Sequence, residues 1–90
     1  MTRRIAVVVR DRQGEALRMA LGLTLMDDEV DVFAAGRKFD WTEQDLTNIE
    51  VLQELEAGLF SDHRENEETE FVATEMMAHR LAEYDHVIPY

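Results

Sequence analysis

Hydrophobic patterning divides the chain into alternating strand and helix segments. Residues 5–9 (IAVVV) form an uninterrupted apolar run and are mostly β-branched, which is typical of a strand that is buried on both faces. Residues 30–34 begin with apolar–polar alternation and predict a second, half-exposed strand, and residues 57–60 and 86–90 predict two shorter strands. Pro89 cannot donate a backbone hydrogen bond, so the last strand is expected at an edge of the sheet.

Three segments between these strands have the spacing of helices. Residues 16–26 carry apolar side chains on two faces, so this helix needs two partners, the sheet and a second covering element. Thr42 and Asp45 resemble a capping box in front of a second amphipathic helix. Thr74 is the predicted N-cap of a third helix, whose apolar residues also fall on one face.

The resulting order βαβαβαβ predicts a single α/β domain over residues 1–90. We expect a three-layer sandwich in which a four-stranded parallel sheet carries helices on both faces. The expected strand order is 2-1-3-4, because it places residues 5–9 in the interior and the alternating strand 30–34 at an edge. Residues 61–70 contain five acidic side chains and one arginine, and are expected to form a solvated loop.

Charge and hydropathy narrow the classes of partner. The chain has 90 residues, and its 9 basic and 20 acidic side chains give a net charge of −11. Such a surface repels phosphates, which argues against a general nucleic-acid binder and against docking on anionic lipid. The longest apolar run, residues 5–9, is far shorter than the roughly 20 residues of a membrane span, and the N-terminal residues lack a signal-peptide pattern. A soluble, cytoplasmic protein is therefore expected.

The absence of cysteine excludes several chemistries. Disulfides, thiolate metal sites, cysteine nucleophiles and persulfide carriage all need a residue that this sequence lacks. The three histidines have no spacing that gathers them around a metal, and neither GxGxxG nor GxxxxGK[ST] is present. No metal and no cofactor are expected.

A candidate ligand site follows from the predicted sheet. Ligands of open α/β sheets bind outside the carboxyl ends of the strands. The loops that follow the predicted strands bring six candidate binding residues to that edge: Arg10, Arg12, Arg37, Lys38, His63 and Arg64. Together with the N-terminus of the first helix they are typical of a site for phosphate, sulfate, a carboxylate or an acidic partner. The alternative is that these are ordinary solvated loop charges, neutralised locally by Asp11, Asp40, Asp62 and Glu65.

Two further groups have alternative interpretations. His63, between Asp62 and Arg64, is either a proton-transfer group or an exposed loop histidine. The succession Ser61-Asp62-His63 does not predict a catalytic triad, because a triad is a spatial arrangement and not a run of neighbours. Phe39 and Trp41 either anchor a subunit interface or cap the edge of the sheet.

Four segments carry a family resemblance. They are RIAVVVR (residues 4–10), EALRMALGL (15–23), EVDVF (29–33) and LAEYDHVI (81–88), and their apolar pattern resembles the DsrE/DsrF/TusD-like sulfur-relay family. The resemblance implies a DsrE-like or flavodoxin-like α/β domain that assembles into oligomers, in which active members carry persulfide sulfur on a loop cysteine. Because this chain has no cysteine, no catalytic residue carries over, and the resemblance implies a non-catalytic member.

Three functions stay open at this point. The first is a non-catalytic structural or regulatory subunit linked to sulfur relay, which forms a homo-oligomer or a hetero-oligomer with related DsrE-like subunits. The second is a small module that binds an anion or a nucleotide through the six residues at the strand ends. The third is an enzyme that acts through His63 and neighbouring carboxylates.

Overall fold

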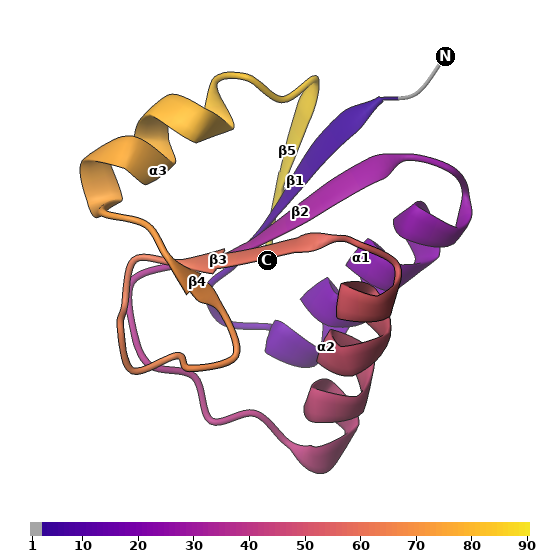
Figure 1. Ribbon diagram of the computed structural model, residues 1–90, viewed down its shortest axis with the longest axis horizontal. Coiled ribbons are helices and arrows are strands. Elements are labelled where there is room, and N and C mark those ends of the chain that lie inside the picture. The colour runs from indigo at the N-terminus through magenta and orange to yellow at the C-terminus, as the bar shows by residue number, and fades with distance from the viewer. Residues whose placement is uncertain (1–2) are drawn as a thin grey trace.

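The computed structural model describes residues 3–90 and has an α/β fold with one parallel sheet (Figure 1). In chain order the elements are β1 (Arg4–Val9), α1 (Gln13–Leu25), β2 (Glu29–Ala34), α2 (Glu43–Glu54), β3 (Gly58–Ser61), β4 (Glu70–Phe71), α3 (Thr74–Leu81) and β5 (His86–Pro89). The strands lie in the order β4-β3-β2-β1-β5, and every neighbouring pair is parallel. The general α/β prediction is confirmed, but the sheet has five strands where four were expected.

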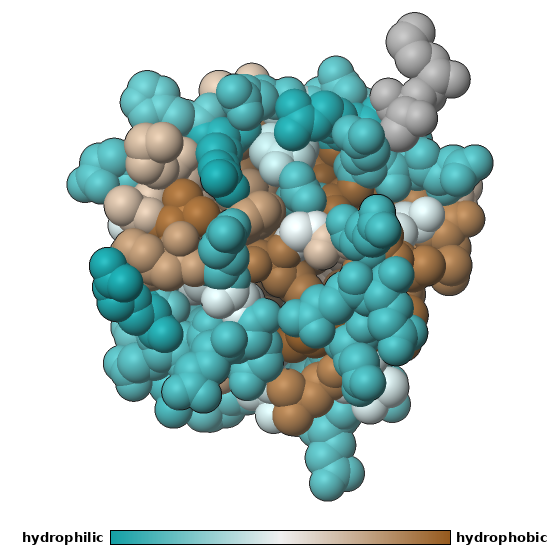
Figure 2. Space-filling view, viewed as in Figure 1, coloured by the Kyte–Doolittle hydropathy of each residue, from teal (hydrophilic) through white to brown (hydrophobic). Residues whose placement is uncertain are grey.

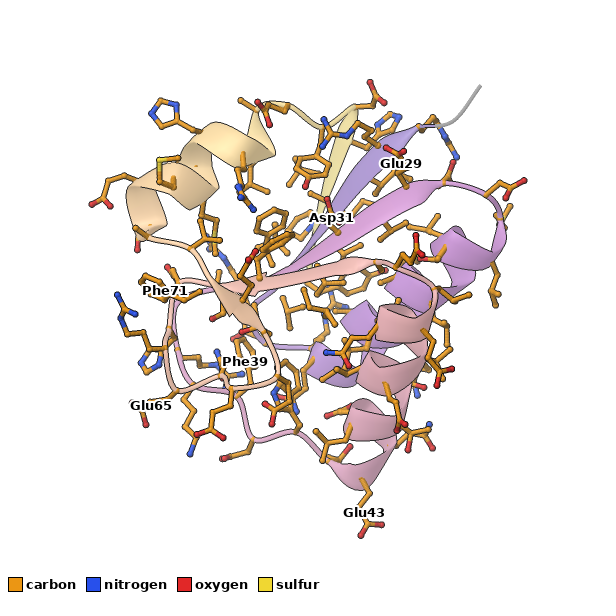
Figure 3. The ribbon with its side chains drawn as sticks, viewed as in Figure 1. Glu29, Asp31, Phe39, Glu43, Glu65 and Phe71 are labelled. Carbon is orange, nitrogen blue, oxygen red and sulfur yellow. The ribbon has the colours of Figure 1, made fainter. Side chains whose placement is uncertain are left out.

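The predicted strand order is wrong for β2, which lies between β1 and β3 and not at an edge. The expectation was based on the polar Asp31 within this strand, which projects toward the side of the sheet that carries α3 (Figure 3). Its carboxylate accepts hydrogen bonds from the backbone N–H of Gly58 (2.9 Å) and from the hydroxyl of Tyr84. An interior strand can hold this polar residue because both oxygens of the carboxylate have partners.

The positions of the first and last strands of the chain agree better with the sequence. Residues 5–9 are interior, as predicted, because β1 pairs with both β2 and β5. β5 pairs only with β1, which confirms the edge position predicted from Pro89.

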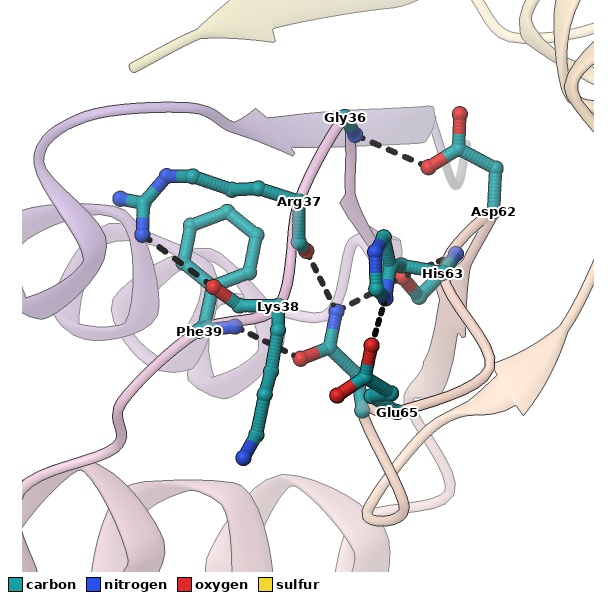
Figure 4. Close-up of polar contacts among 9 residues, drawn as sticks. Gly36, Arg37, Lys38, Phe39, Asp62, His63 and Glu65 are labelled. Carbon is teal, nitrogen blue, oxygen red and sulfur yellow. Dashed lines mark hydrogen bonds and ion pairs between the residues drawn. The ribbon is translucent and has the colours of Figure 1, made fainter.

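The acidic stretch 61–70 is not simply a solvated loop. Its last residue begins the short edge strand β4, which pairs with β3. In its middle, Asn66 is only 2% exposed, and its side-chain amide donates to the carbonyl of Arg37 (2.8 Å) and to Ser61 Oγ (2.9 Å). Asn66 Oδ1 also accepts the backbone N–H of Phe39 (2.7 Å) (Figure 4). This loop is therefore fastened to the segment between β2 and α2.

The path of the chain explains where the helices lie. From β1 to β4 the strands follow one another across the sheet in a single direction, whereas β5 returns to the far side of β1. Because strand crossovers keep one handedness, α1 and α2 lie on one face and α3 on the other (Figure 1). The second helical layer is thus a single eight-residue helix, which is less cover than the predicted sandwich supplies.

The helix ends show one prediction confirmed and one displaced. Thr42 and Asp45 form the predicted capping box of α2, in which Thr42 Oγ1 accepts the N–H of Asp45 at 3.0 Å. The buried Asp45 carboxylate also accepts the side-chain amide of Gln13 at 2.7 Å, which joins the start of α1 to the start of α2. In α3 the N-cap is Ala73, which makes no side-chain cap, and Thr74 is the first helical residue.

Two cores result, one on each face of the sheet. The core beneath α1 and α2 contains Val7 and Val9 of β1 together with Leu17 and Leu52. The core beneath α3 contains Ala6 and Val8 of the same strand together with Phe33, Val72 and Met77. Burial of alternate residues on opposite faces accounts for the uninterrupted apolar run of β1.

One membrane-related observation completes the fold. Among residues 3–90, no helix combines the length and the apolar character that a membrane crossing requires.

Candidate ligand-binding site

A cavity of about 480 Å³ lies between α3 and the edge of the sheet at which β1, β2 and β3 end, called the carboxyl edge below. Its apolar wall consists of Val8, Ala35, Met77, Ala78 and Leu81. The volume falls within the range of small-molecule sites, which are typically lined by apolar groups and a few well-placed polar ones. The position follows from the fold, because α3 starts at this edge and buries only Met77 among its residues.

The polar rim of the cavity consists of Arg10, Asp11, Gly36, Arg37, Asp62 and Thr74. Asp62 joins three elements there, because Oδ1 accepts the N–H of Gly36 at 2.9 Å and Oδ2 accepts the hydroxyl of Thr74 at 3.0 Å. Figure 4 shows the first of these bonds. Gly36 has a φ of +86°, a conformation that glycine adopts without a steric penalty. Asp62 therefore fastens the start of α3 to the carboxyl edge.

The two arginines of the rim are held differently. The Arg37 guanidinium donates to the carbonyl of Arg10 through Nη2 (2.9 Å) and Nε (3.2 Å), and it lies 4.1 Å from the centre of the Phe39 ring. In the part of the chain that the structure describes, the Arg10 guanidinium has no hydrogen bond, ion pair or aromatic ring of its own. Arg10 is thus a cation in the lining of a mainly apolar cavity, and its guanidinium has no partner within residues 3–90.

The six predicted binding residues do not form one site. Arg10 and Arg37 meet at the cavity, whereas Arg12 pairs with Glu15 (3.4 Å) and lies over the ring of Tyr90. Arg64 lies 3.9 Å from the centre of the Phe71 ring. The predicted basic surface is therefore divided, because Arg12 and Arg64 interact with acidic or aromatic neighbours and do not line the cavity.

Lys38 and His63 lie outside this cavity. Lys38 lines a separate hollow of about 340 Å³ that it shares with Trp41, Glu65 and two further glutamates. His63 Nδ1 is buried, makes no hydrogen bond to any residue from 3 to 90, and lies 3.8 Å from a carboxylate oxygen of Glu65 (Figure 4). His63 therefore faces the acidic loop and not the ligand cavity.

The serine at the end of β3 is held by neighbouring groups. Ser61 is fully buried, and its Oγ accepts from the backbone N–H of His63 (3.0 Å) and from the side chain of Asn66. No group of three or more potential metal ligands occurs within residues 3–90.

The aromatic pair Phe39 and Trp41 belongs to the core beneath α1 and α2. The two rings are stacked with centroids 5.1 Å apart, and Phe39 is buried. Of the two interpretations offered by the sequence, this packing fits a cap on the end of the sheet.

Several residues of the cavity were missed in the sequence. The sequence predicts Asp11 only as a neutralising neighbour and Thr74 only as a helix cap. Met77, Ala78 and Leu81 lie in the third helix, whose place depends on the strand order. The position of β5 beside β1 is what brings α3 over the carboxyl edge, and no local pattern encodes it.

Comparison with known proteins adds no relative: no family model, curated protein or solved structure matches the chain. The DsrE-like resemblance consequently stays a prediction.

Proposed function

We propose that this chain is a small-molecule-binding domain whose ligand occupies the cavity between α3 and the carboxyl edge. One observation carries the proposal: a cavity of about 480 Å³ with an apolar wall is also lined by Arg10, whose guanidinium has no partner within residues 3–90. An apolar body of the ligand packs on Met77 and Leu81, and an acidic group binds Arg10. Guanidinium groups suit this role because they bind carboxylates and phosphates through two parallel hydrogen bonds.

The use of the other arginines supports the choice of Arg10. Five arginines lie over aromatic rings, in the pairs Arg4/Tyr84, Arg12/Tyr90, Arg37/Phe39, Arg64/Phe71 and Arg80/Phe60. Arg3 forms an ion pair with Asp28 at 3.2 Å. Within residues 3–90 this leaves Arg10 and Arg18 without partners, and of these two only Arg10 lines the cavity.

The proposed activity is binding without catalysis. Asp62 already accepts two hydrogen bonds at the rim, and His63 lies outside the cavity. These contacts favour recognition of a ligand over proton transfer to it.

The test measures ligand binding in wild type, Arg10→Ala and Arg18→Ala. A panel of aliphatic and aromatic carboxylates and phosphate esters is titrated by calorimetry, and saturable binding by at least one of them is expected. Loss of a charge-assisted contact should weaken that binding roughly tenfold or more in Arg10→Ala. Arg18→Ala removes an exposed arginine of α1 and should leave the affinity unchanged. The proposal fails if no compound binds or if both variants lose affinity equally.

A second candidate function, a subunit of an oligomeric assembly, is favoured by the end of α1. Leu25 and Met26 are 70% and 73% exposed, and Figure 2 shows apolar surface over this end of the helix. We infer a structural or regulatory role for this surface, in contact with a second copy or a related subunit, as the DsrE-like resemblance implies.

Sedimentation velocity separates this second candidate from a monomer. The double change Leu25→Lys and Met26→Lys should dissociate an oligomer that uses this surface. Met76→Lys is the matched control, because it alters an exposed apolar residue on α3. A wild-type protein that stays monomeric over the whole concentration range contradicts the assembly role.

A further inference from the structure

We infer that the ligand is a zwitterion with an apolar body, of the kind represented by α-amino acids with apolar side chains. The inference rests on the proposed binding function and specifies the chemical class of its ligand. It comes from Arg10 and Asp11, two consecutive residues of opposite charge that both line the cavity.

Both members of this pair lack protein partners for their side chains. Neither the Arg10 guanidinium nor the Asp11 carboxylate has a hydrogen bond or ion pair within the described residues 3–90, and no ion pair joins the two. Their backbone is fixed, because the N–H groups of both residues point to the carbonyl of Tyr90, at 3.4 Å and 2.9 Å. The cavity lining thus includes one cation and one anion at consecutive positions of an anchored segment.

The other two charges of the rim are already engaged. Arg37 donates to the carbonyl of Arg10, and Asp62 accepts from Gly36 and Thr74. Asp62 would have to release the start of α3 in order to receive a ligand. Asp11 is therefore the rim carboxylate that is available to an ammonium group.

This charge arrangement discriminates between ligand classes. A phosphate or sulfate dianion on Arg10 would lie among two carboxylates of the same rim, and like charges in a cavity disfavour binding. A simple carboxylate would pair with Arg10, but it would displace water from the Asp11 carboxylate without replacing the hydrogen bonds that this water makes. A zwitterion pairs with both residues, while its side chain covers Met77 and Leu81.

The experiment compares three probes that share one apolar body. They are L-phenylalanine, 3-phenylpropanoate, which lacks the amino group, and phenethylamine, which lacks the carboxylate. Leucine, 4-methylpentanoate and 3-methylbutylamine form the corresponding aliphatic set. Calorimetric titration at neutral pH should show one amino acid binding roughly tenfold or more tightly than both of its truncated analogues.

Variants assign the amino group to its partner. Asp11→Asn should weaken binding of the amino acid roughly tenfold and leave binding of the matching carboxylate unchanged or stronger. Asp40→Asn is the control, since Asp40 is exposed and lines the other hollow. Circular dichroism verifies that both variants are folded.

The outcomes separate this inference from the proposed function. If a truncated carboxylate binds as tightly as its amino acid and is indifferent to Asp11→Asn, the zwitterion inference is wrong and the binding function stands. If none of the six probes and no compound of the wider panel binds, both are wrong. Selective binding of the amino acid that depends on Asp11 and Arg10 supports both.

Discussion

The two faces of this sheet are built from the same strands but are covered very unequally. On one face, α1 and α2 bury large side chains such as Leu17 and Leu52 completely. On the other, α3 has eight residues, of which Met77 alone is buried, and a cavity remains beside the helix. Apolar burial contributes most of the stability of a fold. The comparison indicates that the α1/α2 face maintains the fold and that the α3 face has room for a ligand.

The ends of the helices show the same inequality. α2 begins with a complete capping box that is tied to α1 through Gln13. The N-cap of α3 is Ala73, which makes no side-chain cap, and the side-chain bond at the start of this helix runs from Thr74 to Asp62. The first arrangement stabilises a helix by local and long-range contacts, whereas the second depends on one half-buried carboxylate.

The largest effect is expected from a truncation in the α1/α2 core. Leu17→Ala should reduce the free energy of unfolding by about 2–5 kcal/mol, because it removes a fully buried side chain and leaves a void. Met77→Ala should cost clearly less, since this side chain already borders a cavity. Urea denaturation measures both values, and equal losses would refute the difference between the faces.

The next-largest effect is expected from Asn66, and it is compared with that of Asp62 in the same loop between β3 and β4. Asn66→Ala should cost about 1–3 kcal/mol, because it leaves the N–H of the buried Phe39 without an acceptor. Asp62→Ala should have little effect on global unfolding but should speed hydrogen exchange in α3, whose first residue it releases. Urea denaturation and hydrogen exchange read by mass spectrometry test the pair. If hydrogen exchange in α3 becomes faster in the Asn66 variant and not in the Asp62 variant, Asp62 is not the residue that fastens α3.

A smaller effect concerns the helix caps. Thr42→Ala should lower the stability by about 1 kcal/mol, because it removes the acceptor of the α2 capping box. Ala73→Ser should instead increase the stability by a few tenths of a kcal/mol or more, by supplying α3 with an acceptor. Thermal unfolding of both variants gives the comparison, and a loss in Ala73→Ser would show that the start of α3 has no room for a cap.

The smallest effect is a dependence on alkaline pH that belongs to the α3 face. Burial and the hydrogen bond to Asp31 raise the pKa of Tyr84 above its ordinary value of 10.0. The unfolded chain therefore loses this proton first, so the contribution of Tyr84 is complete below about pH 10 and is lost as the pH rises further. Thermal unfolding across this range should decline more steeply in wild type than in Tyr84→Phe. Identical slopes would show that the tyrosine does not contribute.

The parts of the fold that the sequence predicts are those that depend on near neighbours. The run from Ile5 to Val9 predicts an interior strand because its five consecutive residues are all apolar, so both faces of the strand are apolar. The capping box joins Thr42 to Asp45, three positions later, and Pro89 by itself predicts an edge. Each of these signals is complete within a short segment of chain.

The parts that could not be predicted depend on distant partners. In the sequence, Asp31 indicates an edge strand. In the structure, its hydrogen bonds come from Gly58 and Tyr84, which are 27 and 53 residues away. The burial of Asn66 likewise depends on backbone groups 27 and 29 residues away. The candidate site follows this rule, because Arg10 and Arg37 lie within three residues of a strand end, whereas the α3 wall is placed only by the strand order.

The pairing of the first and last strands also has a consequence for the order in which the molecule folds. Arg4 donates its N–H to the Asp85 carboxylate at 2.8 Å, a contact that closes a loop of 81 residues. Loop-closure entropy and contact order slow such pairings relative to those of β1 with β2 and of β2 with β3. We therefore expect β5 to join the sheet late and to carry α3 into place at that step. The ligand cavity would then be among the last features to form in each newly made molecule.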